Sequence, residues 1–368
     1  MLIIDAHLDL AWNAVSYDRD QLQPIESLRK AEAHMTGKSR GGCTVSLPEL
    51  RRGEVGICLA TILARSYPPQ SVLLDKVGAI GNRTRGKITL RENLDFANQT
   101  IACAAAQAQL AYYQLLEQQG HLRFVRDRAT LDELWSQWTN GGTDAPLGII
   151  LSMEGADPII EPDQAQWWWQ QGLRTACLAH YGPSAYAMGT GGDGPLTDRG
   201  RQLLKEFDRL GIILDLVHTA DSALAEALDR YEGSVFVSHG NCRALVQHDR
   251  QMTDDQIRLI CERGGVIGIV LDCWMLKANY RSSDRDQVSL ETLADHIDHI
   301  CQLTGNRNHV GIGSDLDGGF GIEQVPHDMN TIADLQNIEP ILTERGYSES
   351  DVAAIFHGNW LRFFREAM

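Results

Sequence analysis

A histidine and an aspartate two positions apart, His7 and Asp9, close a short and mostly apolar run that begins at residue 3. In a β-strand, residues i and i+2 point to the same face, so these two side chains are expected to point together from one strand end. An imidazole and a carboxylate directed at one point are half of a metal site. If they bind a metal, further histidines or acids must stand at the ends of other strands.

Five other apolar runs close with a residue of the same kind. The residues at these ends are Glu154, His180, His218, His239 and Asp315. A single histidine after an apolar run is usually a packed or capping residue, but four of the 12 histidines occupy this one position. Imidazole and carboxylate ligands without a thiolate suit Zn²⁺, with Mn²⁺ or Co²⁺ as substitutes. The pattern therefore predicts a zinc site.

The number of these residues is sufficient for two ions. Three histidines, one aspartate and one glutamate can hold two metals if the glutamate bridges them. Two metals clamp a water, lower its pKa toward neutrality and polarise the carbonyl under attack, which is the chemistry of a hydrolase. Asp315 would then be spare, and a carboxylate near the bridging water can take its proton and pass it to the leaving amine.

Alternating strands and helices must bring these residues to one place. Apolar runs predict strands at 3–9, 55–63, 147–154, 175–180, 212–218, 234–239, 266–272 and 309–315. Helical spacing predicts helices at 93–118, 161–171, 198–210, 220–232, 253–263 and 289–304. The polar, irregular residues 13–55 are interpreted as an excursion of loops and short helices over one end of the molecule.

Eight strands in alternation with helices predict a single (β/α)₈ barrel of the TIM type over residues 1–368. A doubly wound open sheet is the alternative. In a barrel the carboxyl ends of the strands surround one cavity, and active sites lie there. Two further helices, 331–345 and 349–367, are expected to pack outside the barrel.

Bulk composition fits an acidic soluble enzyme. The formal net charge of -16 argues against nucleic acid or an anionic membrane surface as a partner. No apolar run approaches the length of a membrane span, about 18 residues. No secretory signal opens the chain, so a cytoplasmic location is expected. The eight cysteines are scattered without a C-x-x-C pair and are expected to be reduced.

Several motifs resemble those of one known family. In chain order they are His7-Leu8-Asp9, Ser152-Met153-Glu154-Gly155, the run 214–218, Val237-Ser238-His239 and the run 311–318. They resemble the motifs of the membrane dipeptidase (renal dipeptidase) family, the M19 metallopeptidases. The resemblance covers nearly the whole chain. It implies zinc-dependent hydrolysis of small dipeptides, including L-D dipeptides, on a metal-dependent amidohydrolase-like barrel that forms a homodimer.

Three consecutive tryptophans lie on one predicted helix. Trp167, Trp168 and Trp169 cannot all face the protein core from that helix, so their exposed part is a candidate subunit contact.

The resemblance also implies a role for each site residue. The implied ligands are His7, Asp9 and Glu154 for one zinc and Glu154, His218 and His239 for the other, with Glu154 bridging. His180 would contact the substrate, and Arg250 would hold its C-terminal carboxylate, for which a guanidinium fork is well suited. Asp315 resembles the catalytic aspartate. Asp317 would face the same way on a continuing strand and is the alternative.

The positions beside the ligands leave the preferred dipeptide open. Where many relatives have Ser-His and Ser-His-Ser-Ser, this chain has Val217-His218-Thr219 and Ser238-His239-Gly240-Asn241. One alternative function is another binuclear hydrolase, acting on cyclic amides, lactones or phosphotriesters, or a deaminase. Such enzymes often bridge their metals with a carboxylated lysine near the fourth strand, but that strand ends here in His180 without a lysine. The other alternative is a barrel without catalysis, which would not need Asp315.

Overall fold

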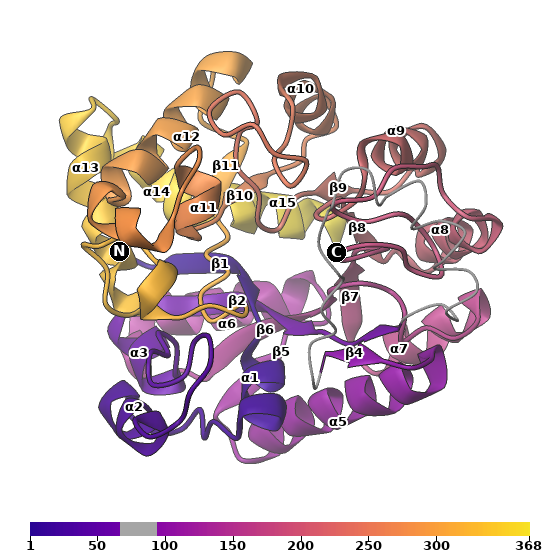
Figure 1. Ribbon diagram of the computed structural model, residues 1–368, viewed down its shortest axis with the longest axis horizontal. Coiled ribbons are helices and arrows are strands. Elements are labelled where there is room, and N and C mark those ends of the chain that lie inside the picture. Colours follow the sequence, from indigo (N-terminus) through magenta and orange to yellow (C-terminus); the bar gives the residue numbers. More distant parts are fainter. Residues whose placement is uncertain (67–93) are drawn as a thin grey trace.

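Eight parallel strands form the centre of the fold in a computed structural model that describes residues 1–66 and 94–368 (Figure 1). The strands are β1 (Ile3–Leu8), β2 (Val55–Ile62), β6 (Leu147–Met153), β7 (Leu173–Ala176), β8 (Ile213–Asp215), β9 (Val235–Phe236), β10 (Ile267–Ile269) and β11 (Val310–Ile312). They pair in the order β10-β11-β1-β2-β6-β7-β8-β9. A parallel bridge between Val237 and Ile267 joins the two ends of this order. The predicted barrel is confirmed, and the open-sheet alternative is wrong.

The first strand along the chain, β1, pairs with the last one, β11. Asp5 of β1 stands opposite Ile312 of β11. The buried Asp5 carboxylate also accepts hydrogen bonds from the backbone of His7 at 3.1 Å and of Ser314 at 2.9 Å. This carboxylate therefore fixes the backbone of both strands just below the ends that carry the predicted site.

Several strands are shorter than predicted. β7, β8 and β11 end before His180, His218 and Asp315, which lie in the loops that follow. His218 and Asp315 have φ angles of 58° and 56°, and this left-handed backbone cannot continue a strand. The predicted strand ends at these positions are wrong, although the residues still follow their strands by only three or four positions.

Helices cover the barrel between the strands. They are α5 (Gln99–Gln118), α6 (Arg128–Gly141), α7 (Ala165–Gln170), α8 (Asp198–Leu210), α9 (Asp221–Arg230), α10 (Asp254–Glu262) and α12 (Leu290–Thr304). The predicted helix at 198–210 has the observed bounds of α8. The helix predicted from residue 93 begins only at Gln99, because Asn98 caps it by accepting from the Ile101 backbone and Asp95–Phe96 forms strand β4, which pairs with β3 (Arg65–Ser66). An unpredicted strand, β5 (Leu122–Phe124), pairs with β6.

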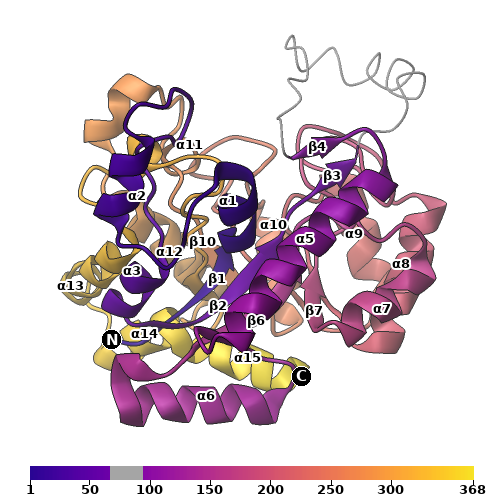
Figure 2. The same cartoon turned by 90° about the horizontal axis from the view of Figure 1, so that it is seen from below.

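The C-terminal segment closes one side of the barrel from outside. It contains α13 (Ile338–Glu344), α14 (Glu349–Ala353) and α15 (Asn359–Ala367). Trp360 of α15 donates a hydrogen bond to the Ile312 carbonyl at 2.9 Å and packs directly on Gly311, where a side chain would collide with the indole. Figure 2 shows α15 beside α6, and Arg365 pairs there with Asp132 at 2.6 Å. The predicted position of these helices outside the barrel is confirmed.

The excursion over the other end contains three short helices, α1 (Leu10–Tyr17), α2 (Ile25–Glu32) and α3 (Leu47–Arg52). Arg19, which is buried, holds it together by donating to Glu32 at 2.8 Å, to Asn13 at 2.6 Å and to the Ser39 carbonyl at 2.7 Å. A buried arginine with three acceptors is a strong anchor, since each bond involves a charged donor. The loop between α2 and α3 is thereby fixed above the barrel.

All eight cysteines are free thiols, and seven are buried. Of the tryptophans on α7, Trp168 is buried, Trp169 is partly buried and Trp167 is 40% exposed, as expected from one helix. Among the described residues, no helix combines the length and the apolar character that crossing a bilayer requires.

Candidate active site

Seven side chains from six strand ends meet in one pocket at the carboxyl end of the barrel. They are His7, Asp9, Glu154, His180, His218, His239 and Asp315. Each stands at the end of its strand or within four residues beyond it. The structure therefore brings together every histidine and acid that the strand ends singled out.

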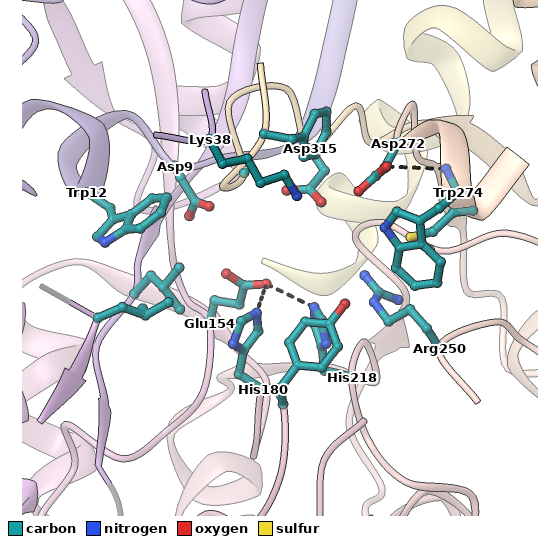
Figure 3. A pocket seen from close by; sticks show the side chains of 16 residues that line it. Asp9, Trp12, Lys38, Glu154, His180, His218, Arg250, Asp272, Trp274 and Asp315 are labelled. Atoms are coloured by element: carbon teal, nitrogen blue, oxygen red, sulfur yellow. Dashed lines mark hydrogen bonds and ion pairs between the residues drawn. The ribbon is translucent and has the colours of Figure 1, made fainter. Parts of the chain in front are cut away.

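Glu154 lies at the centre of this group (Figure 3). Its Oε2 is 3.7 Å from Nε2 of His7, and its Oε1 is 3.2 Å from Nε2 of His218. The same Oε1 is 3.5 Å from Nε2 of both His239 and His180. One carboxylate thus faces different histidines with its two oxygens, which is the arrangement needed to bridge two cations.

Three sets of ligand atoms are compact enough to surround an ion. In each set the atoms lie within 4.8 Å of one another, and the sets are His7, Asp9 and Glu154; Glu154, His218 and His239; and His7, His239 and Asp315. The first two are the ligand sets that the family resemblance implies. The third was not predicted, and it places Asp315 against the same histidines.

The histidines are prepared to bind a cation. Nε2 of His7 and of His239 is buried without a hydrogen-bond partner among the described residues. The other ring nitrogen of His239 lies 2.9 Å from the Ser238 hydroxyl, and Nδ1 of His218 lies 3.0 Å from the Thr190 hydroxyl. Burial, with the nearby charge of Arg250, lowers the pKa of His7 to about 3. Neutral imidazoles whose second nitrogen is held by a hydrogen bond are typical metal ligands.

The carboxylates require a compensating positive charge. Burial raises the pKa of Glu154 and of Asp315 well above the ordinary range, and the neighbouring Asp9 carboxylate adds to both shifts. Several acids removed from water together are unfavourable unless cations neutralise them. Together with the two unpartnered Nε2 atoms, this charge shows that the residues fit divalent metal ions.

Arg250 places a guanidinium in the same pocket. The side chain is buried, and its Nη2 donates to the His239 carbonyl at 3.0 Å. Its Nη1 is buried without a hydrogen-bond partner among the described residues. An unpartnered N–H beside the ligand cluster is suited to a carboxylate that arrives with a ligand.

Asp317 does not face the pocket. Its carboxylate accepts hydrogen bonds from the backbone and hydroxyl of Thr44, both at 2.8 Å, and from the Val45 backbone at 3.1 Å. Its φ of 62° belongs to a turn, so the premise of a continuing strand through Asp315 and Asp317 is wrong. Asp317 instead fastens the excursion at residues 44–45 to the loop after β11.

The pocket has further lining residues that the sequence analysis did not single out. They include Trp12, Lys38, Leu63, Leu94, Tyr181, Asp272, Trp274 and Phe320. Asp272 could have been predicted as a site residue, because it is the last residue of the predicted strand at 266–272, just as Glu154 is the last residue of the predicted strand at 147–154. Lys38 comes from the loop between α2 and α3, where no local pattern indicates that it reaches the pocket.

Arg65, which supports the pocket from outside, was also not predicted from the sequence. It binds Asp95 through two hydrogen bonds of 2.6 and 2.7 Å across the short β3–β4 pair. Its Nη1 also lies 3.1 Å from Nδ1 of His180. An ion pair outside the barrel sheet therefore supports one of the pocket histidines.

A (β/α)₈ barrel with histidines and acids gathered at the carboxyl ends of its strands defines the class of barrels built for metal-dependent chemistry. Within this class, the sequence matches the membrane dipeptidase family (peptidase family M19) over residues 1–368. The chain belongs to this family, which confirms the resemblance seen in its motifs.

Individual relatives agree with this membership. An uncharacterised dipeptidase of Schizosaccharomyces pombe, C3A11.10c, is 29% identical over 225 residues, which are 60% of this chain and 53% of that protein. Dipeptidase 3 of Macaca fascicularis is 31% identical over 172 residues, which are 47% of this chain and 33% of that protein. The chain thus spans about half or less of the length of the curated relatives it matches.

Solved structures share the fold over its full extent. A dipeptidase of the M19 metallopeptidases superimposes with a TM-score of 0.78 at 22% identity and covers 100% of this chain and 98% of its own. A metallopeptidase from Rhodobacter sphaeroides, bound to a phosphinate mimic of the dipeptide L-Ala-D-Ala, gives a TM-score of 0.77 at 22% identity and covers 100% and 99%. These likenesses establish the architecture of the barrel.

Proposed function

We propose that this protein is a metal-dependent dipeptidase. The observation that carries the proposal is Glu154, whose two carboxylate oxygens face different histidines at 3.2–3.7 Å. Membership of the M19 family supports dipeptides as the substrates. The R. sphaeroides structure with an L-Ala-D-Ala mimic supports including L-D dipeptides among them.

The proposed cofactor is a pair of zinc ions bridged by Glu154. The proposed ligands are His7, Asp9 and Glu154 for one ion and Glu154, His218 and His239 for the other. When bound, such ions supply Lewis-acid polarisation of a carbonyl and lower the pKa of water. Imidazole and carboxylate donors without thiolate favour zinc over softer ions.

The protein's own groups would perform the proton transfers and hold the substrate. Asp315 lies 3.7 Å from Nε2 of His7 and 3.9 Å from Nε2 of His239, so its carboxylate borders the space where the peptide bond would lie. It would take the proton of the attacking water and deliver it to the leaving amine. Nη1 of Arg250 would donate to the substrate's C-terminal carboxylate, and His180 would contact the substrate through Nε2.

Metal analysis and hydrolysis assays test this function together. Purified protein supplied with zinc should contain two equivalents per chain and should cleave members of a panel of L-L and L-D dipeptides. A lactone in the same panel tests the alternative of another binuclear hydrolase. Cleavage of the lactone with every dipeptide intact would favour that alternative, whereas no bound metal and no cleavage would favour a non-catalytic barrel. The cytoplasmic location and the homodimer remain predictions.

A further inference from the structure

Asp272 places an additional carboxylate in the wall of the pocket. It follows β10 and caps α11 (Cys273–Leu276), and it is only 6% exposed. Its Oδ1 accepts from Nε2 of Gln324 at 2.6 Å and from the Trp274 backbone at 3.4 Å. The Trp274 side chain also interacts with this carboxylate and favours its charged form. Figure 3 shows the carboxylate directed into the pocket.

A buried carboxylate of this kind is stabilised by a cation. Burial raises the pKa of Asp272 to about 6, while the bond from Gln324 and the charge of Lys38 act in the opposite direction. Lys38 is exposed, reaches over the pocket and forms no close ion pair with any residue of the described chain. A charge held out of water is stabilised when a partner binds it, and Lys38 forms no ion pair with Asp272. Because the Asp272 carboxylate lines the pocket, it is placed to bind a cation that a ligand supplies.

The arrangement of the pocket walls indicates which part of a dipeptide would meet Asp272. Figure 3 shows Asp272, Trp274 and Arg250 on one side. The Arg250 backbone donates to Nδ1 of His248 at 3.0 Å, and the His248 ring lies 4.8 Å from that of Trp274, so this wall is one connected unit. If Arg250 holds the C-terminal carboxylate, the C-terminal side chain lies on this wall.

The opposite wall is apolar. Trp12, Leu63 and Leu94 form one buried cluster there, with exposed fractions of 2%, 3% and 1%. The side chain of the N-terminal residue would face this wall. One wall is therefore apolar and the other acidic. They would favour different side chains at the two positions of a dipeptide.

We propose that Asp272 is a specificity residue that binds a cationic side chain at the C-terminal position of the dipeptide, next to an apolar side chain at the N-terminal position. This inference rests on the proposed dipeptidase function and on the position of Arg250. An ammonium or guanidinium group of the substrate would donate to the Asp272 carboxylate. An acidic side chain at the same position would meet the carboxylate and be rejected. Lys38 competes with the substrate cation and weakens the preference.

The test compares leucyl-lysine with leucyl-norleucine, which has nearly the same shape without the ammonium. The zinc-loaded protein should show a ratio of kcat/KM for these two dipeptides of about 10 to 100, the range of one charge-assisted hydrogen bond. Asp272→Asn should bring the ratio close to one. Asparagine also caps helices and still accepts from Gln324, so the fold should be kept, and the melting temperature checks this. Asp163→Asn, an exposed acid away from the pocket, is the matched control and should keep the wild-type ratio.

Lys38→Met tests the same proposal without altering Asp272. Removing the competing cation should raise the lysine preference by about two- to fivefold, the scale of an exposed charge interaction. Equal use of both dipeptides by the wild type, or an unchanged ratio in Asp272→Asn, would overturn the specificity proposal and leave the dipeptidase proposal intact. A loss in Asp272→Asn that is equal for both dipeptides would also overturn it. If the zinc-loaded protein cleaves no dipeptide at all, both proposals fail.

Discussion

Nη1 of Arg65 lies 3.1 Å from Nδ1 of His180, and the same guanidinium is held by both carboxylate oxygens of Asp95. Because arginine can only donate, Nδ1 of His180 must accept, and the ring proton must sit on Nε2. Nε2 is the nitrogen that faces Glu154, at 3.5 Å. Arg65 therefore makes His180 a hydrogen-bond donor toward the pocket.

The first prediction follows from this contact. Arg65→Gln should lower kcat/KM for dipeptides by about tenfold, the scale of one hydrogen bond to a charged group, with the metal content unchanged. Arg65→Lys should restore part of the loss. In a His180→Ala background, Arg65→Gln should have little further effect, because the two residues act together. Full additivity of the two losses would contradict the proposed link.

Arg123→Gln is the matched control for this series. Arg123 also binds a carboxylate through two bonds, to Glu133 at 2.8 Å each, but this pair is exposed and far from the site in the fold. Arg123→Gln should leave kcat/KM for dipeptides unchanged. A comparable loss in this variant would mean that the Arg65 effect reflects general damage to the fold.

Asp315→Asn separates a catalytic role from a metal-binding one. As a general acid and base, Asp315 should be needed for turnover but not for metal retention, so kcat should fall by roughly 10²-fold or more with two zinc equivalents still bound. Elemental analysis beside steady-state kinetics makes this measurement. Loss of one zinc would instead show that Asp315 belongs to the third ligand set, with His7 and His239.

Arg250→Ala should affect free dipeptides more than amidated ones. With the unpartnered Nη1 removed, KM for a dipeptide with a free C-terminal carboxylate should rise by about 10- to 100-fold, the range for a charge-assisted hydrogen bond. KM for the corresponding dipeptide amide should change little, since the amide offers no carboxylate. An equal rise for both substrates would rule out the carboxylate role.

His296 should make the fold sensitive to acid. Its ring is buried, and Nδ1 accepts from the Cys242 backbone at 3.1 Å. Burial lowers its pKa from 6.5 to about 4. Between these values the unfolded chain binds a proton that the folded ring does not, so the free energy of unfolding should fall as the pH is lowered through this window. The slope from this residue is about 1.4 kcal/mol per pH unit.

Denaturant unfolding of His296→Asn between pH 4 and 6.5 would isolate this contribution. Other titrating groups act in both proteins, so the difference between wild type and variant gives the slope of His296 alone. His34→Asn, an exposed histidine on the loop after α2, is the control and should retain the wild-type slope. Parallel pH curves for wild type and His296→Asn would contradict the prediction.

Local patterns predicted the barrel and the members of its site, because an apolar run followed by a histidine or an acid is visible within ten residues of sequence. The same patterns could not place Asp317. Its orientation depends on two left-handed residues, Asp315 and Asp317, which turn the chain where a strand was expected. Alternation of side chains is informative only as long as the backbone stays extended.

Residues brought in by distant contacts were beyond local prediction. Lys38 reaches the pocket because buried Arg19 ties the excursion together through Glu32 and the Ser39 carbonyl. Arg65 reaches His180 across 115 residues of sequence. Such positions are set by the packing of the whole chain, and no propensity or spacing near them carries that information.

The pairing of β1 with β11 also has a consequence for biosynthesis. The hydrogen bond from the Ser314 backbone to Asp5 spans 309 residues. At a synthesis rate of about 5–20 residues per second, β1 waits roughly 15–60 s on the ribosome before its neighbour exists. Contacts of such long range also close slowly. The barrel therefore cannot close between these two strands, and Asp315 cannot join His7 and Asp9, until residues 310–315 have been synthesised.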